Sequence, residues 1–197
     1  VGHYYEDQFK IEDDLVKIKT PKLVYDAKAT AEMLERAHGV FDGILGVRLQ
    51  GWTPGFAPWD VLAMWHSPGG VLYDLADRPE FMHKLIARFT EATLAALDQA
   101  EALGVIGPQT DTIHCTGAWT DDLPAPGNDP QGVRAKDLWT CGMSQIFSAV
   151  SPAMHEEFER PYLGRWFERF GLAYYGCCEP LDDRIDMVRK LPNVRKI

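Results

Sequence analysis

The chain has 197 residues, of which 46% are hydrophobic and 25% charged, and its formal net charge is -9. This composition is that of a globular protein with a real core, so it excludes disordered and fibrous classes. The negative charge, without a long cluster of Lys or Arg, argues against nucleic acid as a partner. No apolar stretch approaches the ~20 residues that span a bilayer, and no signal peptide opens the chain, so we expect a cytoplasmic protein without membrane contact.

Residues 1–22 are predicted to form an extended lead-in, with a short strand at residues 15–19. Asp26 is placed to cap a helix that Gly39 ends. Residues 43–50 are aliphatic and bounded by glycine, which is the pattern of a strand buried on both faces. The lead-in is therefore followed by a helix and then a strand.

Two short helices are predicted at residues 57–65 and 71–75. A long amphipathic helix follows, starting near Pro79 and ending before Gly104. Residues 105–116 are strand-like. The order of elements again alternates between helix and strand.

Residues 123–132 are rich in proline and glycine and are predicted to form a loop. A second amphipathic helix starts at Pro152 and ends at Gly171. Residues 172–176 are predicted to form a strand, and residues 180–190 a short helix with acidic residues early and basic residues late.

This alternation predicts an α/β protein with a parallel sheet and helices outside it, in a barrel or a doubly wound layer. We treat residues 1–197 as one domain, with β/α units over residues 23–197. The chain begins with Val1 and its last residues look like the start of a strand, so we expect a fragment of a larger protein.

Three of the predicted strands end at residues able to carry chemistry, and active sites of parallel barrels lie at the carboxyl ends of the strands. These residues are Gln50 and Trp52 after the strand at residues 43–50, His114 and Cys115 after the next one, and Cys177, Cys178 and Glu179 after the last complete one. The sequence therefore predicts a site formed by these strand ends.

Thiolate and imidazole groups are the usual ligands of zinc, and a catalytic zinc commonly has three protein ligands. The predicted metal ligands are Cys177, Cys178 and His114. Neighbouring cysteines on an extended chain point to opposite faces, so one of the pair is expected to face the site. The alternative is that His114 and Cys115 are ordinary core residues, as we expect for Cys141. Four cysteines in a chain of this length suit a reducing compartment.

Other side chains have more than one interpretation. Glu179 is a base, a metal ligand or the cap of the helix after it. Trp52 and Trp119, with Gln50, are predicted to contact substrate, although single aromatic residues are more often part of a core. The remaining histidines lack a partner in the sequence pattern and are expected to be solvated; they are His3, His38, His66, His83 and His155.

Residues 151–158, the Pro161-Tyr162 pair and residues 175–180 resemble the uroporphyrinogen decarboxylase superfamily. Within it, they are most similar to bacterial members related to the corrinoid-dependent methyltransferases. The resemblance implies a (β/α)8 barrel of the TIM type. Such a barrel typically needs about 250 residues, so this chain would supply its middle portion.

In the methyltransferase branch, a His-x-Cys at a strand end and a later cysteine hold a zinc ion. The zinc activates a thiol that accepts a methyl group from a corrinoid on a partner protein. By the resemblance, Cys177 occupies the cysteine place and Tyr175 the histidine place; shifting the alignment by one residue gives Cys178 and Gly176. Tyr175 and Glu179 are accordingly the catalytic candidates.

The sequence thus predicts a methyltransferase with zinc and a corrinoid protein or a small molecule as partner. One alternative is a cofactor-free decarboxylase, although a chain with net charge -9 is a poor host for a polyanionic porphyrinogen. Another is a barrel that binds a corrinoid or small ligand without catalysis. An incomplete barrel would expose sheet edges, which a second copy or the remainder of the barrel would cover.

Overall fold

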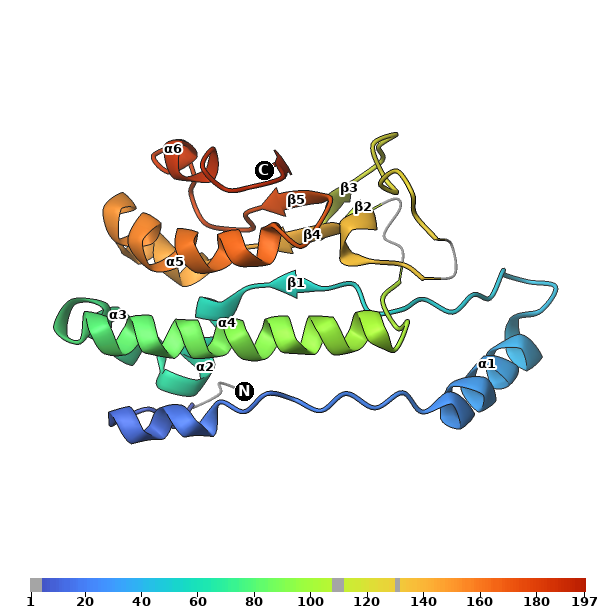
Figure 1. Ribbon diagram of the computed structural model, residues 1–197, viewed down its shortest axis with the longest axis horizontal. Helices are drawn as coiled ribbons and strands as arrows, with labels where there is room; N and C mark the ends of the chain where they lie inside the picture. Colours follow the sequence, from blue (N-terminus) through green and yellow to red (C-terminus); the bar gives the residue numbers. More distant parts are fainter. Residues whose placement is uncertain (1–4, 108–111, 130–131) are drawn as a thin grey trace.

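The computed structural model describes residues 5–107, 112–129 and 132–197. A four-stranded parallel sheet with the order β1-β4-β5-β6 lies at its centre, and helices cover it (Figure 1). The strands are β1 (Gly55–Phe56), β4 (Trp139–Gly142), β5 (Leu172–Tyr175) and β6 (Val194–Lys196). The predicted α/β class and the parallel sheet are confirmed. In the described part of the chain the sheet is open, with β1 and β6 at its two edges.

Strand β5 lies inside the sheet, and all four of its residues are buried. This explains its unbroken apolar sequence, because a strand covered on both faces has no polar side. Its register with β4 runs from Trp139 opposite Leu172 to Gly142 opposite Tyr175, so the two strands end at the same level. The residues that follow them share one edge of the sheet.

The helices are α1 (Ala27–Phe41), α2 (Pro58–His66), α3 (Pro68–Asp77), α4 (Pro79–Ala102), α5 (Pro152–Phe167) and α6 (Ile185–Val188). Proline opens four of them, α2 to α5, where its missing N–H leaves no helical hydrogen bond unmade. A methyl group at Gly142 would lie 2.6 Å from Leu163 Cδ1, so only glycine lets α5 pack this closely on the end of β4. The predicted helices at α1 to α5 are confirmed.

Two predicted strands are wrong. Residues 15–19 overlap the 3-10 helix η1 (Glu12–Lys17), where the Asp14 carboxylate accepts the backbone N–H groups of Lys10 and Ile11. This local capping outweighs a short alternation of apolar residues. Residues 43–50 form a largely exposed segment without regular structure. Within the part of the chain that the structure describes, no strand pairs with them, and an apolar run alone does not define a strand.

Two further predictions are only partly right. Residues 180–190 are turns and irregular backbone around the four-residue helix α6, which is their only α-helical part. The strand predicted at residues 105–116 is a single bridge from Ile106 to Trp52, followed by a hairpin. Residues 108–111 of that prediction, like residues 130–131 of the predicted loop, lie outside the described residues.

The lead-in is tied to the body through His66, which was expected to be solvated and is only 1% exposed. Its two ring nitrogens lie 2.7 Å from Asp7 Oδ1 and 2.6 Å from Asp74 Oδ2. Arg78 also contacts the Asp74 carboxylate. Burial opposes ionisation of both carboxyl groups. Hydrogen bonds from His66 and from the Phe9 backbone N–H nevertheless hold the pKa of Asp7 below its usual range, and those from Arg78 and His66 do the same for Asp74.

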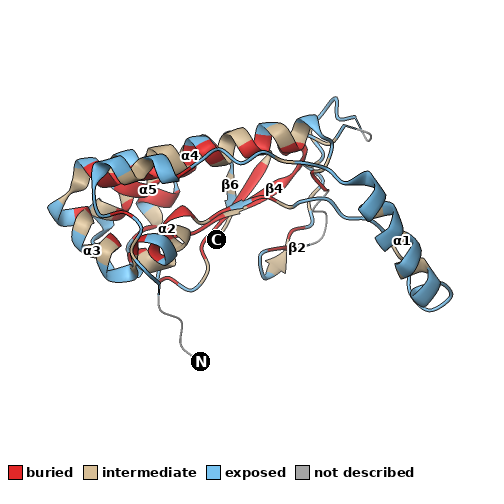
Figure 2. Ribbon diagram, turned by 90° about the horizontal axis from the view of Figure 1, so that it is seen from below, coloured by how far each residue is buried: buried red, intermediate tan, exposed pale blue. Residues whose placement is uncertain are grey.

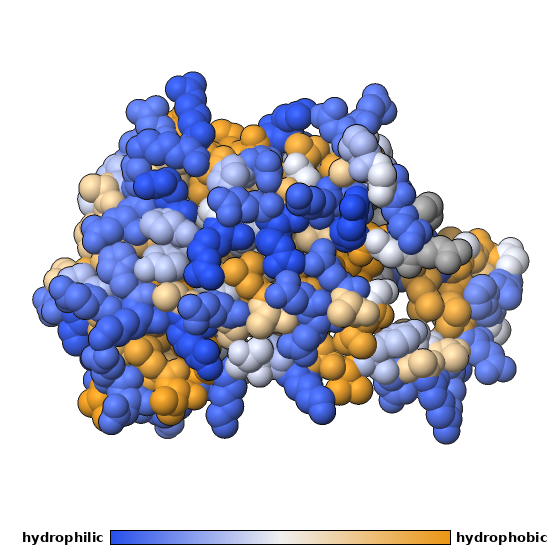
Figure 3. Space-filling model, in the orientation of Figure 1, coloured by the Kyte–Doolittle hydropathy of each residue, from blue (hydrophilic) through white to orange (hydrophobic). Residues whose placement is uncertain are grey.

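Helix α1 has no buried residue and projects from the body as an arm (Figures 1 and 2). Apolar side chains are visible on this end of the surface in Figure 3. The exposed ones on the arm and the segment after it are Met33, Val40, Phe41, Ile44, Leu45 and Leu49. None of the helices in the described part of the chain combines the length and apolar character that a bilayer crossing requires.

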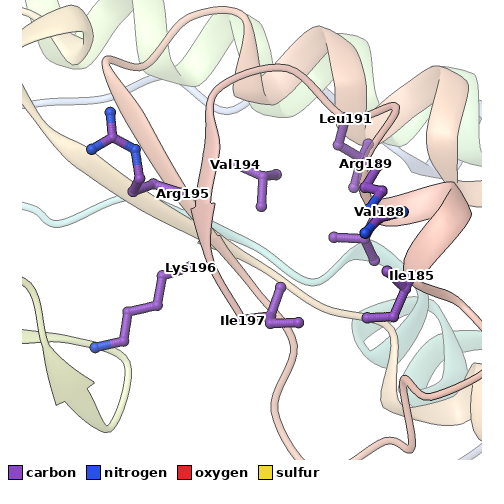
Figure 4. Close-up of a pocket in the computed structure, with 8 residues that line it drawn as sticks. All are labelled: Ile185, Val188, Arg189, Leu191, Val194, Arg195, Lys196 and Ile197. Carbon is purple, nitrogen blue, oxygen red and sulfur yellow. The ribbon is translucent and has the colours of Figure 1, made fainter.

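A cavity of about 420 Å³ lies between β6 and α6, at the far edge of the sheet (Figure 4). Val194 and Ile197 face Ile185 and Val188 across it, whereas Arg195 and Lys196 extend from β6 on the side away from α6. None of the predicted site residues lines this cavity.

We predict that Asp74→Asn lowers the free energy of unfolding by about 1.5 to 3 kcal/mol at pH 7, because it removes charged hydrogen bonds with His66 and Arg78. The folded pKa of Asp74 is depressed, so its contribution is present above the unfolded pKa and is lost as pH falls through the folded one. The difference between variant and wild type should therefore shrink below about pH 4.

Urea unfolding at pH 7 and at pH 3 measures both effects. Asp186→Asn is the matched control, since the Asp186 side chain is 94% exposed and its change should stay within about 0.5 kcal/mol. A loss in Asp74→Asn no larger than in this control would contradict the prediction.

Candidate functional site

The two-residue loop of a β-hairpin carries His114. Strands β2 (Thr112–Ile113) and β3 (Thr116–Gly117) pair antiparallel around His114 and Cys115. His114 has φ 52°, in the left-handed region that tight hairpin loops require and that few side chains adopt without strain. The hairpin packs against β4, so its loop lies next to the sheet.

The hairpin brings His114 to the end of β5. The Nε2 atom of His114 lies 3.0 Å from the Sγ atom of Cys177, and the Sγ atom of Cys178 lies 3.4 Å from that of Cys177. Cys177 is half-buried, whereas Cys178 and Cys115 are exposed. The structure thus brings together the three side chains predicted as metal ligands.

Glu179 holds the turn that carries Cys177. The Glu179 carboxylate accepts the backbone N–H of Cys177 at 2.9 Å and the backbone N–H of Ser144 at 3.3 Å. It is 8% exposed and does not cap a helix, since α6 begins only at Ile185. Glu179 therefore joins the segments that follow β4 and β5.

The environment of Cys177 favours the protonated thiol. Burial, the neighbouring Cys178 and the charge of Glu179 raise the pKa of Cys177 to about 11. A thiolate is the nucleophilic form, so Cys177 needs a base or a cation to become reactive near pH 7. The His114 imidazole is the base within hydrogen-bond distance.

The donor atoms at this site are of the kind that zinc binds, since they are thiols and an imidazole. Their arrangement does not fit a zinc ion. Among the residues that the structure describes, no three side chains of His, Cys, Asp or Glu are placed to hold one metal ion. The Glu179 carboxylate, predicted as a further metal ligand, accepts hydrogen bonds from two backbone N–H groups.

Behind the thiols lies a buried polar cluster, formed by Ser144, His155, Glu159 and Tyr175. Glu159 accepts hydrogen bonds from Tyr175 Oη at 2.6 Å and from Ser144 Oγ at 2.5 Å, and its carboxylate contacts His155 Nε2. His155 Nε2 also lies 2.7 Å from Tyr175 Oη. All four side chains are at most 1% exposed. Burial and the Glu159 carboxylate raise the pKa of Tyr175, so the phenol stays protonated.

This cluster corrects one expectation, since His155 was expected to be solvated and is fully buried. Tyr175 points its hydroxyl into the cluster, and its predicted catalytic role stays a prediction. Sequence reasoning missed Ser144 and Glu159. In the sequence, His155 and Glu159 are four residues apart. This spacing places both on one face of α5 and could have predicted that they contact each other.

The predicted substrate-binding residues do not join this site. Trp52 lines an apolar cavity of about 350 Å³ together with the segment before α1 and the end of α4. Gln50 is exposed. Trp119 is 77% exposed and packs its ring over Gly117. Contact of these three side chains with a substrate stays a prediction.

Comparison of the chain with protein-family models, with curated proteins and with solved structures gives no significant match.

We predict that Cys178 reacts with iodoacetamide faster than Cys177 at pH 8, because Cys178 is exposed and Cys177 keeps its proton. The Cys177 rate should rise about tenfold per pH unit between pH 8 and 10, as its thiolate fraction grows below a pKa of about 11. Peptide mass spectrometry after timed alkylation measures each rate.

Glu179→Gln removes one of the charges that raise this pKa and should speed alkylation of Cys177 at pH 8. A wild-type Cys177 rate that is already constant from pH 7 to 9 would contradict the prediction.

Proposed function

We propose that this chain is part of a (β/α)8 barrel enzyme like those of the uroporphyrinogen decarboxylase superfamily, and that it transfers a methyl group at Cys177. One observation carries the proposal: His114 Nε2 lies 3.0 Å from Cys177 Sγ at the carboxyl end of a parallel strand. A nucleophile and a base within hydrogen-bond distance, at the sheet edge where α/β enzymes bind ligands, favour thiol chemistry.

The chain's own residues would act as follows. His114 Nε2 takes the thiol proton, and the Cys177 sulfur attacks the methyl carbon of the donor. The new C–S bond forms as the bond between methyl and donor breaks, and the electron pair of that bond leaves with the donor. A methylated corrinoid on a partner protein, the donor implied by the resemblance, would supply this electrophilic methyl group.

The raised pKa of Cys177 is compatible with this role. A thiol of high pKa forms a more nucleophilic thiolate, provided that a base removes its proton in the step itself. Glu179 supports the reaction indirectly, because it accepts the Cys177 N–H and fixes the turn.

The barrel is supported by the parallel order of β4, β5 and β6 and by the helix α5 that connects β4 to β5. Strands of this kind, each joined to the next by a helix, are the repeating unit of a (β/α)8 barrel. The open edge at β6 is where a further unit would add.

We expect Cys177→Ser to abolish methyl transfer from methylcobalamin to the protein. His114→Gln should slow it about 10² to 10⁴-fold, the usual contribution of a general base. The methylated Cys177 peptide is measured by mass spectrometry. Cys141→Ser is the control, since Cys141 lies within β4 and should leave the rate unchanged.

Methylation that is equal in wild type and Cys177→Ser would contradict the proposal. Release of carbon dioxide from a porphyrinogen, unaffected by a chelator, would instead favour the decarboxylase alternative.

Zinc held by Cys177, Cys178 and His114 stays a prediction, because these donors would have to rearrange around one ion. Metal analysis of the protein tests it. One zinc per chain, lost in both Cys177→Ser and Cys178→Ser, supports the metal version. A zinc-free wild type, or unchanged occupancy in both variants, contradicts it and leaves His114 as the sole activator of the thiol.

A further inference from the structure

The polar cluster of Ser144, His155, Glu159 and Tyr175 has a composition unusual for a core. Burying a carboxylate is unfavourable unless hydrogen bonds satisfy it. Glu159 is satisfied from three elements: His155 lies on α5 itself, Tyr175 is the last residue of β5, and Ser144 follows β4. The carboxylate therefore fixes one helix relative to two strand ends.

The cluster continues to the surface through Ser144. The Ser144 hydroxyl donates to Glu159 Oε1 at 2.5 Å, while its backbone N–H donates to Glu179 Oε1 at 3.3 Å. The other oxygen of Glu179 accepts the N–H of Cys177 at 2.9 Å. Ser144 thus links the buried carboxylate of Glu159 to the carboxylate of Glu179 at the site.

We propose that Glu159, together with His155, Tyr175 and Ser144, is a positioning cluster that holds the Cys177 thiol against His114. The connection runs from Glu159 through Ser144 to Glu179 and then to the backbone of Cys177. The proposal deepens the proposed function, and it rests on that function only for the catalytic meaning of the thiol.

The geometry assigns positioning rather than direct catalysis to these four residues. All are at most 1% exposed, and none lines a cavity described for this protein. The Tyr175 hydroxyl is occupied by Glu159 and His155. Tyr175 therefore acts on the site through its neighbours, not by contact with a substrate.

The test uses the hydrogen bond between Cys177 and His114 as its readout. In a background with Cys115, Cys141 and Cys178 changed to serine, Cys177 is the single thiol. Its infrared S–H stretching band reports whether the thiol is hydrogen-bonded. His114→Ala in this background calibrates the band of the free thiol.

Ser144→Ala and Tyr175→Phe each remove one hydroxyl of the cluster without changing the packing volume much. Either change should move the S–H band toward its position in His114→Ala and slow alkylation of Cys177 at least fivefold at pH 8, because the thiol loses contact with its base. Thr90→Val is the matched control, because Thr90 is fully buried on α4 and its hydroxyl bonds only the carbonyl of Ile86. The control should leave the band in place and the alkylation rate within twofold.

An unchanged band in both cluster variants would overturn the proposal, and so would an equal shift in Thr90→Val, which would indicate general loosening. Thermal unfolding of each variant identifies any that fails to fold, and the other cluster variant then decides. No methyl donor enters the experiment. Failure of methyl transfer with the expected band shifts would therefore refute the proposed function and leave the positioning cluster standing.

Discussion

The buried carboxylate of Glu159 is the interaction on which the arrangement of the sheet edge depends. It takes hydrogen bonds from groups that belong to α5, to the end of β5 and to the segment after β4. Because an unsatisfied buried charge is strongly destabilising, these three elements keep one relative position. Close packing at Gly142 adds to this, since α5 lies directly against the end of β4.

The reactive side chains at the carboxyl edge of the sheet lie on the outer side of this Glu159 cluster. Glu179 spans the two strand ends through backbone N–H groups, and the turn that it holds presents Cys177 to His114. His114 itself comes from a separate hairpin, held in a left-handed conformation by a two-residue loop. The site is therefore built from two independently supported loops that meet at one sulfur–nitrogen contact.

Local sequence patterns were sufficient for the elements with strong periodicity or clear end signals. Helix α5 follows from Ser151-Pro152 and its apolar stripe, and β5 from an apolar run that ends at glycine. The patterns predicted strands wrongly where the apolar run was short and no neighbouring strand paired with it. Residues 15–19 became a 3-10 helix, and residues 43–50 an exposed segment, because strands need neighbours that a local pattern does not reveal.

The sequence by itself determined the α/β class, the helices α1 to α5, and the residue types gathered after β5. Only the tertiary structure decided which of them meet. His114 and Cys177 are far apart in the chain, and their contact depends on how the hairpin packs on the sheet. His155 and Tyr175 are likewise joined by burial around Glu159, not by any local motif. Hydrogen bonds between distant segments form only once packing has brought those segments together, so local patterns identify the reactive groups but not their partners.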